Sequence, residues 1–168
     1  DYSDDDDLPE PTTTTTTTKK KQHPKRRRQK QKWSGRTFRS PVSGAAVLVG
    51  RNRRENDYLS CVLQSDGDYW LHARGHAGAH VVLQLSKLQR QHQILHDDDL
   101  QFAADAAAFY SDVKSESKVD VSVALPRHVL KPPRAPPGTV TLREEYATLV
   151  AVPDRHRPYH DDSLKTPT

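Results

Sequence analysis

The first 36 residues of the chain contain almost nothing that a hydrophobic core could use. Residues 1–18 carry six acidic side chains, no basic one and a run of seven threonines, whereas residues 19–36 carry ten basic side chains and no acidic one. A segment of this composition cannot bury enough apolar surface to offset the entropy lost on ordering. We therefore predict a disordered tail over residues 1–41, which leaves room for one compact domain.

The rest of the chain is close to electrically neutral and of ordinary domain size. The polar stretch 154–168 predicts a second disordered tail, so the domain is expected at residues 42–153. A domain of this length buries about two-thirds of the surface of its unfolded chain. The overall charge of +4 thus hides an acidic block, a basic block and a neutral domain.

Two classes of protein are excluded by composition. No apolar run approaches the roughly 20 residues that a membrane-spanning helix needs, so we expect no membrane partner. Cys61 is the single cysteine, which rules out an intrachain disulfide and a multi-cysteine zinc site and suits a reducing compartment.

The chain begins with Asp1 rather than Met, which indicates a processed or truncated piece.

The hydrophobic pattern predicts an α+β fold. Short apolar runs between turn residues predict strands at 45–50, 58–64, 68–74, 79–85, 119–124, 139–143 and 147–152. One segment breaks this pattern: Asp97, Asp98 and Asp99 can cap a helix whose apolar residues recur at helical spacing as far as Ser111. Short links favour a mostly antiparallel β-sheet with this one main α-helix packed on it.

The hairpin at 68–85 brings aromatic and basic side chains together. Alternation places Tyr69, Leu71 and Ala73 on a core face and Asp68, Trp70, His72 and Arg74 on the other face. After a turn with Gly75 and Gly78, His80 should return beside His72 or Ala73. Such a cluster suits single-stranded RNA or a tRNA loop. The alternative is that Trp70 packs under the helix and both histidines bond local backbone groups.

An enzyme is poorly supported. His72, His76 and His80 recur every four residues, but Gly75 and Gly78 argue against a helix and no partner cysteine or carboxylate pattern accompanies them, so no metal site is expected. Cys61 lies mid-strand in the predicted pattern and is read as a buried structural thiol. The chain shows no Gly-rich phosphate loop, no Gly-x-Ser-x-Gly and no paired carboxylates. We therefore predict no catalytic residue and no cofactor.

Two further segments are suited to polyanions. The loop 127–138 holds four prolines among basic residues, and it reads either as a preordered phosphate-contacting loop or as an ordinary surface loop. The basic block favours a nucleic acid or another polyanion, or serves as a nuclear-import signal. Its ten members are Lys19, Lys20, Lys21, Lys25, Arg26, Arg27, Arg28, Lys30, Lys32 and Arg36.

Ordered motifs over about a hundred residues resemble one known family, the RNA-binding R domain of the NFACT proteins. These include eukaryotic ribosome quality-control factors and bacterial fibronectin-binding-protein-A-like alanine-tailing factors. The similar motifs are Gly50-Arg51-Asn52 with Glu55-Asn56-Asp57-Tyr58-Leu59, the hairpin pair Trp70-Leu71-His72 and Gly78-Ala79-His80-Val81, the helix end Phe109-Tyr110-Ser111, and finally Val129-Leu130-Lys131-Pro132 with Pro137-Gly138-Thr139-Val140. Ala77 and Ala79 depart from the family's usual Pro and Ser.

The resemblance implies a noncatalytic module that binds tRNA or rRNA at the large ribosomal subunit in the rescue of stalled ribosomes, with other quality-control proteins as further partners. The chain lacks the family's N-terminal domain, helix-hairpin-helix and coiled coil, so no tailing activity is assigned. A cytoplasmic location is expected, and a plastid address fits standalone R domains. The alternative is a protein-binding scaffold with a basic nucleic-acid or nuclear-targeting arm. The predicted RNA-binding residues are Asn52, Asn56, Asp57, Asp68, Trp70, His72, Arg74, Gly78, His80, Lys131 and Arg134.

Overall fold

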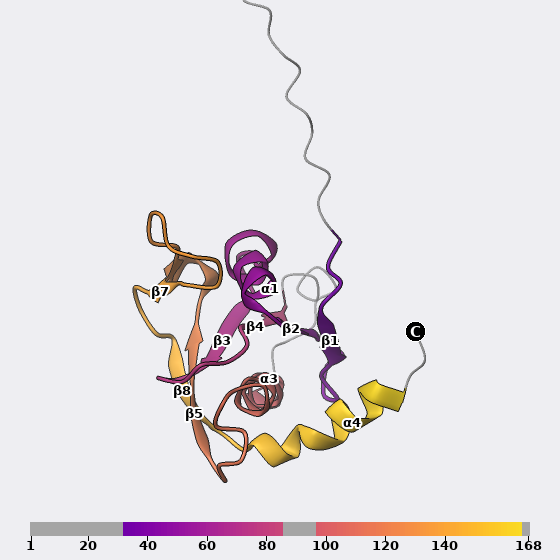
Figure 1. Ribbon diagram of the computed structural model, residues 1–168. Coiled ribbons are helices and arrows are strands. Elements are labelled where there is room, and N and C mark those ends of the chain that lie inside the picture. Colours follow the sequence, from indigo (N-terminus) through magenta and orange to yellow (C-terminus); the bar gives the residue numbers. More distant parts are fainter. Residues whose placement is uncertain (1–31, 86–96, 166–168) are drawn as a thin grey trace, which may run out of the picture. The chain divides into compact units, whose positions relative to one another are not determined.

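The computed structural model describes residues 32–85 and 97–165 (Figure 1). The chain divides into the unit Asp1–Lys32 and the unit Trp33–Thr168, and the fold described below belongs to the second. The predictions made for residues 1–31 and 166–168 lie outside the described residues. Among the helices that the structure describes, none is long and apolar enough to span a bilayer.

A six-stranded sheet in the order β1-β2-β4-β3-β5-β8 forms the centre of the domain. Its strands are β1 (Arg36–Arg39), β2 (Ala46–Val49), β3 (Tyr69–Ala73), β4 (Val81–Gln84), β5 (Val119–Ala124) and β8 (Ala147–Ala151). Every neighbouring pair is antiparallel. The predicted α+β class with a mostly antiparallel sheet is confirmed.

One face of the sheet is covered by α3 (Asp97–Phe109), as the sequence predicted (Figure 1). Alanines at 103, 104 and 107 are fully buried against the inward-facing valines and leucines of the strands. Small side chains let the helix approach the sheet closely. The buried carboxylate of Asp99 accepts hydrogen bonds from the hydroxyls of Ser40 and Ser43, which ties the start of α3 to the turn after β1.

The opposite face is covered by a helix where a strand was expected at 58–64. Helix α1 (Arg53–Tyr58) continues into one π-helical turn, Leu59–Leu63. Asn52 caps α1, because its side chain accepts a hydrogen bond 3.0 Å long from the Glu55 N–H. Leu59 is fully buried and packs with Trp70, which the tryptophan's strand places on this face. The run 59–63 is therefore helical, with Leu59 and Ser60 buried and with Cys61 and Val62 exposed.

A small second sheet completes this face. β6 (Val129–Leu130) pairs with β7 (Thr141–Leu142), so the predicted strand at 139–143 exists only in part and lies outside the main sheet. Val129, Val140 and Leu142 pack against the cluster around Trp70. The proline-rich loop joins these two short strands.

Both predicted tails extend too far into the chain. β1 begins at Arg36 and buries Phe38, so the sheet starts before the expected boundary at residue 42. At the other end, a 3-10 turn (Pro153–Arg155) leads into α4 (Arg157–Lys165). His156, 1% exposed, anchors this segment with its ring centroid 4.6 Å from that of Phe38. One histidine in an otherwise polar segment does not indicate from the sequence alone that the segment packs on the core.

Candidate nucleic-acid interface

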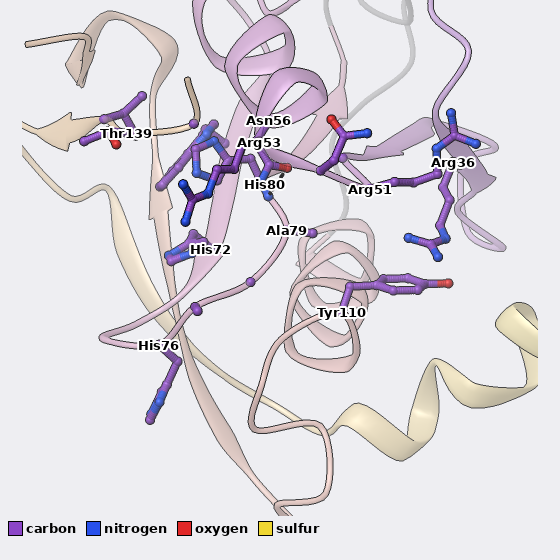
Figure 2. Close-up of a pocket in the computed structure, with 17 residues that line it drawn as sticks. Arg36, Arg51, Arg53, Asn56, His72, His76, Ala79, His80, Tyr110 and Thr139 are labelled. Atoms are coloured by element: carbon purple, nitrogen blue, oxygen red, sulfur yellow. Dashed lines mark hydrogen bonds between the residues drawn. The ribbon is translucent and has the colours of Figure 1, made fainter. Parts of the chain in front are cut away.

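A cleft of about 650 Å³ opens where the start of α1 meets the β3–β4 turn (Figure 2). We call it the arginine cleft. Its lining residues are Arg36, Gly50, Arg51, Asn52, Arg53, Asn56, Trp70, His72, His76, Ala77, Gly78, Ala79, His80, Tyr110, Gly138, Thr139 and Val140. Residues from five separate parts of the chain thus share one surface.

Three guanidinium groups, those of Arg36, Arg51 and Arg53, give the cleft its charge (Figure 2). Arg36 lies 4.5 Å from the centroid of the Tyr110 ring, a cation–π geometry. Arg51 binds the Glu55 carboxylate at 2.6 Å, which lowers the pKa of Glu55. No Asp or Glu is among the described residues that line the cleft. The cleft is therefore suited to an anionic ligand.

Trp70, His72 and His80 form the floor of the cleft. The ring centroids of the two histidines lie 5.4 Å apart, which confirms the predicted return of His80 beside His72. Trp70 is only 3% exposed, and its indole N–H donates to Ser60 Oγ over 2.9 Å. The alternative of a packed tryptophan describes this position, although it packs beneath α1 and the π-helical turn rather than beneath α3.

Both floor histidines are neutral at physiological pH. Burial, reinforced by the neighbouring His72, lowers the pKa of His80 from its ordinary 6.5 to about 4. Burial also lowers the pKa of His72. The positive charge that faces a ligand therefore comes from the arginines, while the histidines offer uncharged polar groups.

The motif residues at 50–57 have structural contacts that explain their spacing. Besides the cap by Asn52, Oδ1 of Asn56 accepts a hydrogen bond of 3.1 Å from the backbone N–H of His80. An ideal Cβ on Gly50 would lie 2.0 Å from that oxygen, so only glycine fits there without a shift. These residues dock α1 on the edge of the hairpin and thereby shape the cleft.

Asp57 holds the proline-rich loop. Its Oδ1 lies 2.6 Å from Lys131 Nζ and accepts a bond of 3.0 Å from the Gly138 N–H. Burial favours a higher pKa for Asp57, but these two donors outweigh it and the pKa is lowered. Lys131 was predicted to bind RNA, but its ammonium is engaged by Asp57.

Three other predicted residues lie away from the cleft. Asp68 is 1% exposed and accepts backbone N–H bonds from Ser65 and Leu85, so it fixes the turn before β3. Arg74 faces Glu145 at 3.7 Å. Arg134 is exposed in the proline-rich loop, with a positive φ of 61°. The geometry gives these three no common surface with His80.

The structure therefore divides the predicted site. Asn52, Asn56, Trp70, His72, Gly78, His80 and Arg36 line the cleft; Asp57, Asp68, Arg74, Lys131 and Arg134 do not. Lys32 is described, and the basic residues from Lys19 to Lys30 lie outside the described part of the chain. Sequence reasoning omitted Arg51, Arg53, Tyr110 and Thr139. Arg51, Tyr110 and Thr139 belong to the motifs that resemble the family, and this resemblance could have identified them as site residues.

The readings of Cys61 and of the histidine trio also need adjustment. Cys61 is exposed in the π-helical turn rather than buried in a strand, and partial burial together with the Asp57 carboxylate raises its thiol pKa. His76 separates from the other two histidines and lies 3.7 Å from Asp112 (Figure 2). In the described segments no group of three or more His, Cys, Asp or Glu side chains is placed to hold a metal ion.

Fold and cleft together define a small α+β module with a cationic, acid-free cleft. The chain belongs to the family of NFACT protein RNA-binding domains, whose model matches residues 36–144. This confirms the resemblance that the motifs indicated. The match begins at β1, which agrees with the earlier start of the domain in the structure.

Two bacterial relatives match more than half of the chain. The chain is 37% identical over 113 residues to the Rqc2 homolog RqcH of Bacillus subtilis and 32% identical over 97 residues to that of Streptococcus suis. These matches cover 67% and 58% of this chain but only 18% and 16% of the relatives. The chain thus spans about a fifth of their length.

A solved structure shares the fold. The C-terminal part of the fibronectin/fibrinogen-binding protein from Streptococcus suis aligns with a TM-score of 0.64 and 28% sequence identity. The alignment covers 76% of this chain and 49% of that one.

Proposed function

We propose that this chain is a noncatalytic module that binds folded RNA, a tRNA or the rRNA of the large ribosomal subunit, through the arginine cleft. Its role would be in ribosome-associated quality control, alongside other proteins of that process. The observation that carries the proposal is the meeting of three arginines and two neutral histidines in a cleft with no acidic residue among its described lining.

The chemistry of the cleft is suited to the phosphates of an RNA backbone. Guanidinium groups bind phosphate oxygens with paired N–H donors, and their spacing over separate elements suits a run of phosphates. Arg53 is exposed, and Arg36 is supported from one side by Tyr110, so both have donors available to a ligand. Phosphate contacts position an RNA and do not by themselves read its sequence.

The basic block at 19–36 supports the same function in a different way. Ten cations without an anion attract a polyanion over long range and accelerate encounter. Arg36 belongs to both the basic block and the arginine cleft, because it lies in β1 and lines the cleft. We propose that the block supplies nonspecific attraction and that the cleft supplies the preference among RNA shapes.

Removal of cleft arginines tests the proposal. The double substitution Arg51→Gln/Arg53→Gln should weaken binding of tRNA about tenfold or more, since hydrogen bonds to charged groups contribute roughly 1.5–3 kcal/mol each. The matched control is Arg39→Gln/Arg127→Gln, which removes the same charge from exposed positions outside the cleft. Equal loss in both variants would mean that net charge alone, not the cleft, binds RNA.

Sedimentation with ribosomal subunits tests the partner. At physiological salt the chain should travel with the large subunit, and the cleft variant should remain at the top of the gradient. Failure of the unaltered chain to associate with either tRNA or the large subunit would contradict the proposed function and favour the alternative of a protein-binding scaffold.

A further inference from the structure

A short chain of hydrogen bonds runs beneath the arginine cleft. The indole N–H of Trp70 donates to Ser60 Oγ over 2.9 Å, and Ser60 Oγ lies 2.6 Å from His80 Nδ1. None of the three residues is more than 5% exposed. These hydrogen bonds link Trp70 in β3, Ser60 in the π-helical turn and His80 directly before β4, so three parts of the fold fix their geometry.

The direction of these bonds determines the tautomer of His80. Tryptophan only donates, so Ser60 Oγ must accept from Trp70. Ser60 Oγ can accept a second hydrogen bond or donate its own proton, and donation to His80 Nδ1, 2.6 Å away, gives that proton an acceptor. Nδ1 therefore carries a lone pair, and the proton of the neutral ring lies on Nε2.

His80 lines the cleft, and its Nδ1 side is engaged by Ser60 behind it. Nε2–H is thus the polar group that the ring can present to a ligand. The backbone of the same residue is held by Asn56, so the ring has little freedom to turn away. Figure 2 labels His80 among the residues that line the cleft.

The shape of the cleft decides what this donor meets. Trp70, 3% exposed, is too buried to stack on a nucleobase, and Arg36 occupies one face of Tyr110. The other lining residues are arginines, asparagines, the histidines His72 and His76, and glycines and small side chains. Phosphate oxygens accept from such donors without stacking.

We propose that Nε2–H of His80, held in this tautomer by the Trp70–Ser60 chain, donates a hydrogen bond to an RNA phosphate oxygen that the arginines bring into the cleft. The proposal rests on the proposed function and specifies its contact. His80 is the binding residue; Ser60 and Trp70 are positioning residues that act through it.

The neutral state of His80 gives this contact a recognisable signature. Its low pKa, about 4, means that the ring donates without becoming a cation over the physiological range. The contribution of His80 to RNA affinity should therefore be constant from about pH 8 to pH 5.5. A histidine that bound phosphate as a cation would instead gain affinity as the pH fell through 6.5.

Nitrogen-15 NMR of the full chain tests the tautomer directly. We expect the His80 ring to show a protonated Nε2 and an unprotonated Nδ1, and we expect Ser60→Ala to yield a mixture of tautomers. Ser122→Ala is the matched control, because Ser122 is a buried serine that does not line the cleft and whose hydroxyl donates to Glu145 rather than to a histidine. A proton on Nδ1 in the unaltered chain would overturn the proposal.

Substitutions of His80 test the contact with RNA, using a tRNA and a short RNA duplex as probes. His80→Gln places an amide N–H near the position of Nε2 and should bind within about threefold of the unaltered chain, whereas His80→Asn should bind about tenfold more weakly. Ser60→Ala should fall between them, and Ser122→Ala should bind normally. Melting temperatures identify loss of folding.

The outcomes separate the two proposals. If Arg51→Gln/Arg53→Gln abolishes binding while folded His80→Asn binds like the unaltered chain, the arginine cleft binds RNA and the histidine contact is wrong. If the unaltered chain binds neither probe, both proposals fail. If His80→Asn loses affinity and His80→Gln keeps it, the phosphate contact stands.

Discussion

Gly50 follows β2 and lies against the side chain of Asn56 in α1. A methyl group there would displace Oδ1 of Asn56, which is 2.0 Å from the ideal Cβ position and accepts the N–H of His80. We expect Gly50→Ala to lower the free energy of unfolding by about 1–3 kcal/mol, because the structure must shift and a buried N–H loses its acceptor. Urea denaturation measures this directly.

The Gly50 prediction has an internal control. In an Asn56→Ala background the clashing oxygen is gone, so Gly50→Ala should cost clearly less than in the unaltered chain. An equal cost in both backgrounds would show that the clash with Asn56 is not the cause.

His156 should make the stability of the protein depend on pH. Burial, with repulsion from His160 and Arg36, lowers its pKa to about 4, and neither ring nitrogen has a hydrogen-bond partner among the described residues. His156 takes up a proton near pH 6.5 in the unfolded chain but only near pH 4 in the folded one. The stability that the buried neutral ring contributes is therefore complete above pH 6.5 and is lost as the pH falls toward 4.

The pKa of His80 is also lowered to about 4, so two histidines should contribute to the loss of stability between pH 6.5 and pH 4. We expect His156→Leu to fold and to show a shallower fall of the unfolding free energy over this window. Denaturation at several pH values measures the slopes, and identical slopes for the variant and the unaltered chain would refute the assignment to His156.

At the scale of elements, the start of α1 combines a cap with a place on the cleft. Asn52→Ala removes the hydrogen bond to the Glu55 N–H and should destabilise the protein by about 1 kcal/mol. Asn52→Asp retains a capping oxygen and should keep the stability, but its carboxylate would stand beside Arg51 and Arg53 in the cleft. Asn52→Ala should therefore lower the melting temperature, whereas Asn52→Asp should change tRNA binding and leave the melting temperature unaltered.

The Asn52 variants also separate fold from ligand binding. Asn52→Asp should weaken tRNA binding several-fold while melting like the unaltered chain. Normal RNA affinity in this variant would show that the ligand does not approach the start of α1.

The elements that the sequence predicted well have an unambiguous period. Alternation along β3 and the spaced alanines of α3 each match one structure only. The apolar run at 59–63 fits a strand or a helix, and its helical state depends on the cap seven residues earlier and on packing over Trp70. Helix α4 has no buried residue of its own, so its sequence resembles a tail.

The sequence predicted that His80 returns beside His72 or Ala73, but it did not predict that Arg36, Arg51 and Arg53 meet in the same cleft. His72 and His80 are joined by one hairpin, whose register follows from local pattern. Arg36, Arg51 and Arg53 meet only because β1 pairs with β2 and α1 folds back over the sheet. Contacts between segments distant in sequence leave no periodic trace in a single chain.

At the scale of the whole molecule, the acidic block at 1–18 and the basic block at 19–36 should act against each other on RNA. Deletion of residues 1–18 removes six acids that compete for the basic block, so RNA affinity should rise, most strongly at low salt. Binding isotherms of the full chain and of residues 19–168 at several salt concentrations measure this. Equal affinities at low salt would rule out the competition.

Deletion of residues 1–31 should flatten the salt dependence, since each phosphate contact to a single-stranded RNA contributes about −0.7 to the log–log slope. The cut is made before Trp33 because Arg36 belongs to β1. Preference for tRNA over a homopolymer should survive the deletion. An unchanged slope would show that the basic block does not contact phosphates. A lost preference for tRNA would show that the cleft does not distinguish RNA shapes.

The C-terminal segment has a practical consequence for the boundary of the domain. The family match ends at residue 144, yet β8 and α4 follow, and His156 fits among Phe38, Phe102 and Phe109. His160 Nδ1 also lies 2.9 Å from the hydroxyl of Tyr110, whose ring carries Arg36 at the cleft. A fragment cut at 144 would expose those rings and leave β5 as an open sheet edge, and such surfaces associate. Expression trials should therefore give aggregates for a fragment ending at residue 144 and a monodisperse protein for one ending after Lys165.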